Sequence, residues 1–176
     1  MKDIDLDGVQ EIIFGSSNGN LYVLTPFGTQ DLLFSTPGSI IGSPAVVDLD
    51  VDGDFEIVFT NQDGNSGKVY AIHHDGSDVE GFPVNIDERM MVGAAAGDLE
   101  GDGEPDVVVC TWDDNIYAIG HDGSIKPGFP FTSTNRFNAP PTLVDLDGDG
   151  DLEIVAGNDS GLLHVLHHDG TEMASY

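Results

Sequence analysis

The sequence predicts an all-β protein built from about four repeats of one antiparallel sheet. Three observations support this prediction. An aspartate-rich loop recurs four times, starting at residues 3, 48, 98 and 145. A β-branched run follows each loop, and a strand of small residues precedes every loop except the first. No segment repeats apolar residues with the period of an amphipathic helix over three turns, so almost no helix is expected.

The second repeat shows how one unit is built. A strand of small residues, 42–48, leads into the loop, and the run 56–59 leaves it. A third strand at 69–72 ends near Asp75-Gly76, and Asp-Gly between strands favours a tight turn because type I′ turns need positive φ. A Phe-Pro segment at 81–84 suits an edge strand, where one N–H can be spared. Four short antiparallel strands in each unit of 45 to 50 residues are typical of one β-propeller blade.

The whole chain, 1–176, is predicted to be one β-propeller segment. Its blades span approximately 1–35, 36–87, 88–134 and 135–176. The first is expected to lack its innermost strand and the fourth its outermost strand. The chain could be part of a longer array, a closed four-bladed ring, or half of a ring completed by a second copy, and the first interpretation is favoured. Unpaired blades would then allow self-association.

Each loop carries carboxylates at positions 1, 3, 5 and 9 and glycine at position 6. The loops span 3–11, 48–56, 98–106 and 145–153 and are called loops 1 to 4. Ca²⁺ takes six to eight oxygen ligands at about 2.3–2.6 Å, so a tight turn rich in carboxylates suits it. An EF-hand is excluded because it needs glutamate at position 12 and flanking helices. Mg²⁺, which keeps several waters, and acidic turns without metal are the alternatives.

The acidic residues are concentrated in these loops. The chain has a formal charge of −27, and 19 of its 32 Asp and Glu lie in the four loops. With only five Lys and Arg, it lacks the basic patch needed to bind nucleic acid or anionic membranes. No apolar run approaches the ~20 residues of a membrane span, and no signal peptide is visible. The single cysteine, Cys110, lies in an apolar run and is predicted to be buried.

These motifs resemble the FG-GAP or VCBS repeat family, the calcium-loop β-propellers known from integrin α-subunit heads and from bacterial secreted and surface proteins. The resemblance rests on the Asp-x-Asp-x-Asp-Gly-x-x-Glu/Asp loop, on Phe14-Gly15 and Ala156-Gly157 at the family's Phe-Gly position, and on Gly42-Ser43-Pro44. It implies up to four Ca²⁺ ions, held by side chains at positions 1, 3, 5 and 9 and by the position 7 carbonyl. The side-chain ligands would be Asp3, Asp5, Asp7, Glu11, Asp48, Asp50, Asp52, Glu56, Asp98, Glu100, Asp102, Asp106, Asp145, Asp147, Asp149 and Glu153. The carbonyl ligands would be Val9, Asp54, Glu104 and Asp151.

Loops 2 and 4 match the family pattern most fully. Loop 3 has Glu100 at position 3 and Pro105 at position 8, so a longer side chain must be accommodated there. Loop 1 has suitable ligands but no strand in front of it.

Two other patterns could suggest catalysis. Residues 15–19 match G-x-S-x-G, but a nucleophile elbow precedes a helix and here a strand follows, so a hairpin turn is the better interpretation. Histidines precede Asp-Gly at His74, His121 and His168 and are interpreted as solvated turn residues. The loop carboxylates have no basic partner nearby in sequence. The chain itself is therefore predicted not to be an enzyme.

The resemblance implies a structural or adhesive interaction module. Its Ca²⁺ ions would be structural, its location extracellular or at the cell surface, and its partner a protein or glycan bound on a propeller face. The alternatives are part of a secreted polysaccharide-degrading enzyme of the lyase type, an accessory domain of a secreted peptidase, or an architectural spacer.

Overall fold

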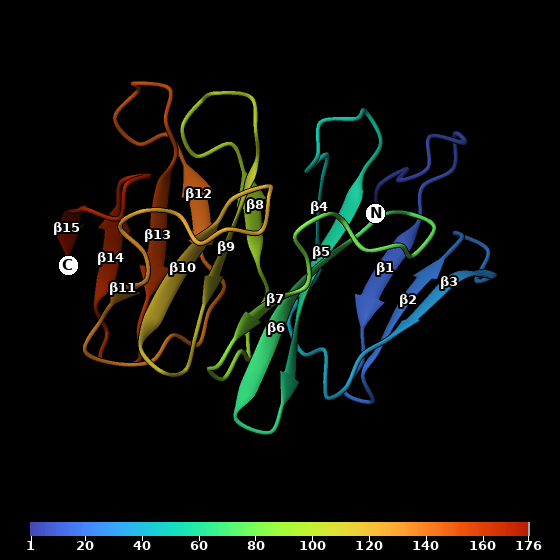
Figure 1. The fold of residues 1–176 in the computed structure, drawn as a ribbon, viewed down its shortest axis with the longest axis horizontal. Coiled ribbons are helices and arrows are strands. Elements are labelled where there is room, and N and C mark those ends of the chain that lie inside the picture. The colour runs from blue at the N-terminus through green and yellow to red at the C-terminus, as the bar shows by residue number, and fades with distance from the viewer. Residues whose placement is uncertain (176) are drawn as a thin grey trace.

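The computed structural model describes residues 1–175, which form four antiparallel sheets placed side by side (Figure 1). The first sheet contains β1 (Ile12–Gly15), β2 (Asn20–Leu24) and β3 (Gln30–Ser35). The second contains β4 (Ala45–Val47), β5 (Glu56–Asp63), β6 (Ser66–Ile72) and β7 (Val84–Ile86). The third contains β8 (Ala95–Gly97), β9 (Asp106–Cys110), β10 (Asn115–Ile119) and β11 (Phe131–Thr132). The fourth contains β12 (Thr142–Val144), β13 (Glu153–Gly157), β14 (Leu163–Leu166) and β15 (Glu172–Ser175). Across these residues, no helix has the length and apolar character to cross a membrane.

Each sheet is an antiparallel meander in which consecutive strands are neighbours, so the predicted all-β propeller segment is confirmed. Strand β8 lies against both β4 and β12, which makes these three the innermost strands of their blades. In the first sheet an isolated bridge between Lys2 and Glu11 stands where the other sheets have a full innermost strand.

The fourth sheet differs from the prediction. Residues 135–176 were expected to lack an outermost strand, but β15 pairs with β14 through Leu166–Glu172, Val165–Ala174 and His164–Ser175. A strand needs only a free partner edge and an extended segment, and the turn at Asp169-Gly170 returns the chain to that edge.

The core lies between neighbouring sheets rather than inside any one of them. Strand β9 shows why, because its successive side chains point to opposite faces. Val107 and Val109 belong to the cluster shared with the second sheet, whereas Val108 and Cys110 belong to the cluster shared with the fourth. Both faces of β9 are therefore buried, as predicted for Cys110, and every sheet–sheet contact contributes to the core.

Aromatic packing joins the first two sheets. The rings of Phe59 and Tyr70 are stacked with centroids 5.0 Å apart, and Phe34 meets Phe59 edge to face at 5.9 Å. Phe59 is fully buried. Such pairs contribute about 0.5–1.5 kcal/mol beyond the area that they bury, so this cluster fixes how the first blade sits against the second.

Candidate metal centres at one end of the sheets

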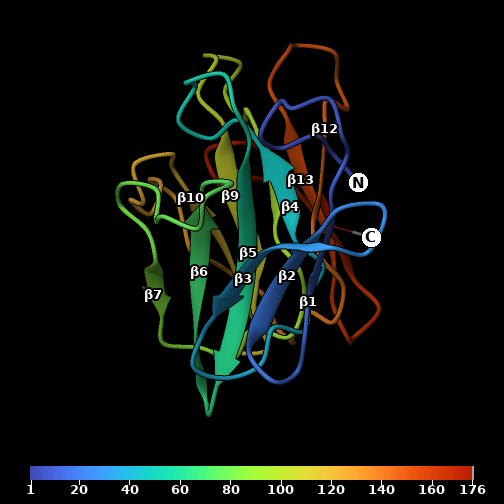
Figure 2. The same cartoon turned by 90° about the vertical axis from the view of Figure 1, so that its right-hand side faces the viewer.

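The four acidic loops lie at the same end of the sheets, at the top of the views in Figures 1 and 2. Loops 2, 3 and 4 each connect the innermost strand of a blade to the next strand, and loop 1 leads into β1. Because each meander repeats the same path, equivalent loops are brought to equivalent places. Within loops 1, 2 and 4, groups of carboxylates lie within 4.8 Å of one another. Neighbouring loops touch through the backbone, because the Phe55 N–H of loop 2 donates to the Ile4 carbonyl of loop 1 and the Leu152 N–H of loop 4 donates to the Leu99 carbonyl of loop 3.

The backbone of each loop is left-handed at positions 4 and 6. Glycine occupies position 6 in all four, where positive φ costs it nothing. At position 4, loops 3 and 4 also have glycine, but loops 1 and 2 have Leu6 and Val51, both at φ of 60°. A β-branched residue in this region is a conformational outlier. Loop 2 therefore stores backbone strain, which is typical of functional sites.

Hydrogen bonds within loop 2 show how the carboxylates are turned inward. The Gly53 N–H donates to Asp48 Oδ1 at 3.4 Å, the Asp52 N–H to Asp50 Oδ1 at 3.3 Å, and the Asp54 N–H to Asp52 Oδ1 at 3.0 Å. Equivalent bonds to the carboxylate at position 5 recur in the other three loops. One oxygen of each of Asp48, Asp50 and Asp52 lies within 4.8 Å of the others. This spacing is one that a single cation can bridge.

The glutamate at position 9 closes loops 1, 2 and 4. One carboxylate oxygen accepts the N–H of position 2, from Ile4 to Glu11 at 2.9 Å, from Leu49 to Glu56 at 2.6 Å and from Leu146 to Glu153 at 2.8 Å. These glutamates are at most 4% exposed.

The second oxygen of the position 9 glutamate is left for another partner. Glu153 Oε1 is buried and receives no hydrogen bond from the residues described, and the same holds for Asp54 Oδ1 in loop 2. An unsatisfied buried carboxylate oxygen is costly. A hard divalent cation among these oxygens would remove that cost, so loops 2 and 4 fit Ca²⁺ in their donor chemistry.

Burial and the nearby carboxylates disfavour the ionised form of several of these acids. Burial, opposed by the Leu49 N–H and reinforced by neighbouring carboxylates, raises the pKa of Glu56 to about 7. Burial also raises the pKa of Glu11 in loop 1 and of Asp147 in loop 4. Each loop thus concentrates negative charge that a bound cation would stabilise.

Histidines lie closer to the loops than the sequence indicated. His73 Nδ1 is 3.3 Å from Glu56 Oε1, and His167 Nδ1 is 3.5 Å from Glu153 Oε1. His74 and His168 pair with the position 7 carboxylates Asp54 and Asp151.

Their interpretation as merely solvated turn residues was therefore incomplete. The recurring His-His-Asp-Gly sequence was the signal that could have placed them. An imidazole nitrogen can add to the oxygen donors of loops 2 and 4.

In loop 3, His121 pairs with Glu104 at position 7, but a lysine rather than a histidine meets the carboxylate at position 9. Lys126 Nζ lies 2.9 Å from both carboxylate oxygens of Asp106 and 2.5 Å from Glu100 Oε2. These two acids occupy positions 9 and 3 of the loop. A hollow of about 260 Å³ borders them and Gly120. Sequence reasoning missed Lys126 because it lies 20 residues beyond Asp106 in the chain.

A second polar cluster joins the end of the third blade to the fourth blade. Ser133 Oγ is 2.8 Å from His164 Nε2, and His164 Nδ1 is 2.7 Å from Glu172 Oε1. His164 takes the strand position at which the other blades have tyrosine. The Asn158 side chain donates to the same serine hydroxyl at 2.8 Å. The cluster therefore ties β14 to β15 and to the segment after β11.

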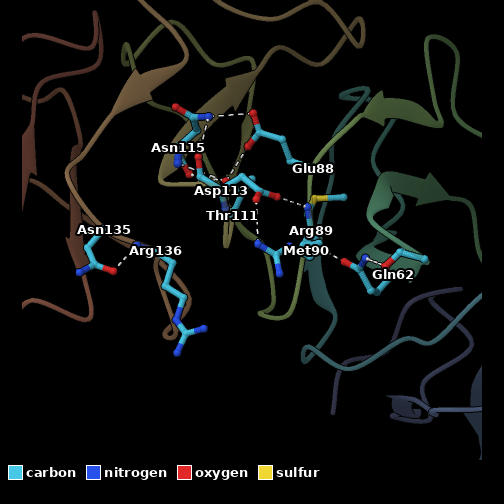
Figure 3. A network of polar contacts seen from close by, with 10 residues as sticks. Gln62, Glu88, Arg89, Met90, Thr111, Asp113, Asn115, Asn135 and Arg136 are labelled. Carbon is cyan, nitrogen blue, oxygen red and sulfur yellow. Dashed lines mark hydrogen bonds and ion pairs between the residues drawn. The ribbon is translucent and has the colours of Figure 1, made fainter.

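At the end of the sheets opposite the acidic loops, where β9 turns into β10 (Figure 1), polar contacts join successive blades, and Figure 3 shows them from close by. Glu88 accepts bonds from Thr111 and Asn115, and Arg89 pairs with Asp113 at 2.9 Å. The Trp112 ring lies against the guanidinium groups of two different linkers, those of Arg89 at 5.8 Å and Arg136 at 4.7 Å. Both guanidinium groups also pair with aspartates, Arg89 with Asp113 and Arg136 with Asp159, so they form a clamp between blades rather than an anion site.

Comparison with protein families identifies the repeat. The family model described as FG-GAP-like repeat matches residues 48–109 and 98–156, more than half of the chain. No curated protein matches the chain in sequence.

Solved structures show the same fold. The V. cholerae biofilm matrix protein Bap1 matches 99% of this chain with a TM-score of 0.74 and 22% identity. The computationally designed Ika8 protein matches all of this chain with a TM-score of 0.69 and 14% identity. BamB from Moraxella catarrhalis matches 99% of this chain with a TM-score of 0.67 and 18% identity. The chain spans 27%, 47% and 48% of these three chains, respectively.

Proposed function

This chain belongs to the FG-GAP-like repeat family, and we propose that its acidic loops bind Ca²⁺ ions that hold the propeller segment together. One observation carries the proposal. In loop 4, the buried Glu153 uses one oxygen to close the loop and leaves the other unsatisfied beside Asp147 and His167. Loops 1 and 2 repeat the same closure with Glu11 and Glu56.

The role proposed for the ion is structural. Each ion would tie the innermost strand to its neighbour at the point where three or four carboxylates repel one another. The position 7 carbonyls of Val9, Asp54 and Asp151 would add a fifth ligand in loops 1, 2 and 4, and water would supply the rest of the six to eight oxygens. A site held at 100 times its dissociation constant stabilises the folded state by about 2.7 kcal/mol, so several sites together would dominate the stability of a domain of this size.

The biological role proposed for the segment is interaction with a protein or glycan outside the cell or at its surface. Two facts support it. The repeat motif resembles that of secreted and surface proteins, and the V. cholerae protein that this chain resembles in fold is described as a biofilm matrix protein. The acidic surface, with a formal charge of −27, disfavours nucleic acid and anionic lipid as partners.

Thermal unfolding with and without calcium tests the structural role. In Ca²⁺ the melting temperature should exceed that of the chelated protein by many degrees at equal ionic strength. Asp149→Asn, which weakens loop 4, should lose part of that difference, whereas Asp31→Asn in β3 serves as the control and should lose none. Equal melting temperatures with and without Ca²⁺ would count against the proposal.

A hydrolytic role is the second candidate, because Ser133, His164 and Glu172 have the connectivity of a serine hydrolase triad. Against it, Asn158 donates to the hydroxyl that would attack. Incubation with a fluorophosphonate probe separates the two: labelling of the wild type that Ser133→Ala abolishes would favour the enzyme. Cleavage of pectic fragments would instead indicate the lyase alternative.

A further inference from the structure

We propose that Lys126 takes the place of the metal ion in loop 3, so that this loop is closed by a built-in cation and does not take up Ca²⁺. The inference rests on the proposed calcium binding of the other loops. It gives the chain one blade whose loop is independent of calcium between two blades whose loops depend on it.

The contacts of the ammonium group carry the argument. Lys126 Nζ lies within 2.9 Å of both oxygens of Asp106 and 2.5 Å of Glu100, and the lysine side chain is only 12% exposed. Asp106 is itself 1% exposed. A buried carboxylate needs a partner charge, and here the lysine supplies it. Ca²⁺ would have to expel this ammonium to reach ligands 3 and 9.

Backbone hydrogen bonds show that the lysine is a substitution within the repeat. Val79 N–H donates to the Ala71 carbonyl at 3.0 Å in the second blade, and Lys126 N–H donates to the Ala118 carbonyl at 2.9 Å in the third. The two residues are therefore equivalent, and an apolar side chain in one blade is a cation in the next.

A second residue near loop 3 also differs between the second and third blades. His73 N–H donates to Ser77, and Gly120 N–H donates to Ser124, so glycine replaces the histidine that approaches loop 2. The fourth blade keeps His167 at this position. Loss of the imidazole removes a side chain that would compete for Asp106, and the hollow beside Gly120 remains next to the lysine.

Loop 3 differs from the other loops at two ligand positions, and both differences favour binding of the lysine. Position 3 is Glu100 rather than aspartate, and its longer side chain reaches the ammonium group. Position 9 is Asp106 rather than glutamate, and both of its oxygens bond the lysine. With positions 3 and 9 engaged, loop 3 keeps only three of the five expected ligands, two fewer than loops 1, 2 and 4. Water would have to supply at least half of the six to eight oxygens that Ca²⁺ takes.

The number of Ca²⁺ ions bound per chain, measured by equilibrium dialysis on the full chain, tests the inference. The wild type is compared with Asp102→Asn, which alters position 5 of loop 3 without touching Lys126. We expect no change in that number. Lys126→Val, which copies the second blade, should bind one more Ca²⁺, and adding Asp102→Asn to it should remove that ion again. Lys68→Gln, which removes a lysine elsewhere, is the control and should match the wild type.

Two outcomes would overturn the inference: loss of one ion on introducing Asp102→Asn into the wild type, or no gain in either Lys126→Val or Lys126→Gln. The glutamine variant keeps the chain length and serves if the valine variant does not fold, which circular dichroism reports. Asp52→Asn, the same change in loop 2, examines the proposed function separately, because it should remove one ion whatever happens at loop 3.

Discussion

At the scale of single residues, the position 9 glutamate connects folding to metal binding. One oxygen of Glu56 holds the Leu49 N–H, and the other faces the aspartates of loop 2 and His73. Burial of this carboxylate disfavours its charge. A proton or a metal ion can relieve the same cost, so the two should compete.

The pH dependence of the calcium-free protein follows from this residue. Burial raises the pKa of Glu56 from 4.5 to about 7, so between these values the folded chain holds a proton that the unfolded chain has released. The free energy of unfolding should therefore fall as the pH rises through this window. Glu56→Gln, whose amide oxygen can still accept the Leu49 N–H, should show a shallower fall between pH 5 and 8. Thermal melts of dialysed, calcium-free protein measure it, and an equal or steeper fall in the variant would contradict the assignment.

Backbone strain in loop 2 gives a second prediction. Val51 has φ of 60° and is 55% exposed, so its side chain contributes little packing there. A left-handed backbone costs a non-glycine residue about 1–2 kcal/mol, and glycine would remove this cost. Part of the stabilisation would be offset because glycine has more conformational entropy in the unfolded chain. Val51→Gly should therefore stabilise the protein by about 0.5–1 kcal/mol. The reverse change at the same loop position, Gly148→Val, should destabilise it, and urea unfolding measures both.

At the scale of elements, the innermost strands approach one another through their leading segments. A Cβ at Gly42 would lie 2.2 Å from the Gly93 nitrogen, and one at Gly93 would lie 2.5 Å from the Ser43 carbonyl oxygen. Backbone atoms cannot yield as a flexible side chain can. The small residues in these segments are therefore required by the contact between blades, not by the strands themselves.

Gly42→Ala should accordingly destabilise the protein by about 1–3 kcal/mol, the usual cost of overpacking. Gly157→Ala is a matched control because it also lies in a blade strand region, yet nothing is within 4 Å of a Cβ there. Chemical denaturation of both variants in Ca²⁺ measures the difference. A loss of the same size in both would show that strand propensity, rather than the contact between blades, is responsible.

At the scale of the whole molecule, charge and exposed apolar surface oppose each other. The formal charge is −27, which three bound Ca²⁺ would bring to about −21. Electrostatic repulsion between chains with this net charge disfavours self-association. On the outer face of the first sheet, however, Ile12, Phe14 and Leu33 are 36%, 40% and 44% exposed. Phe14 corresponds to Phe59, which is buried against the preceding blade.

Self-association through that face should therefore depend on calcium. Light scattering should show a molar mass that rises with protein concentration more in Ca²⁺ than in chelator, because bound ions reduce the repulsion. Phe14→Glu should suppress the rise by placing a charge on the apolar face, whereas Phe27→Glu, on a side chain that is 90% exposed in a turn, serves as the control. A mass independent of calcium and of Phe14 would rule out this face as the contact.

The sequence by itself determined the repeat, the strand that follows each loop and the burial of Cys110. These properties depend on local chemistry: alternation of apolar residues sets the buried faces of a strand, and glycine at loop position 6 allows the left-handed turn. The predicted ligands of each loop lie within nine residues of the chain, so their proximity could also be predicted from the sequence. Whether they hold calcium stays a prediction.

Only the tertiary structure decided which side chains from elsewhere reach the loops. His73 lies 17 residues beyond Glu56, and Lys126 lies 26 residues beyond Glu100. The hairpin register brings them there. The recurring His-His-Asp-Gly sequence marks the histidine positions, but no such repeat marks Lys126. The pairing of β15 with β14 was decided in the same way. Which strands pair depends on the length and path of the segments between them. Packing between whole sheets sets that path.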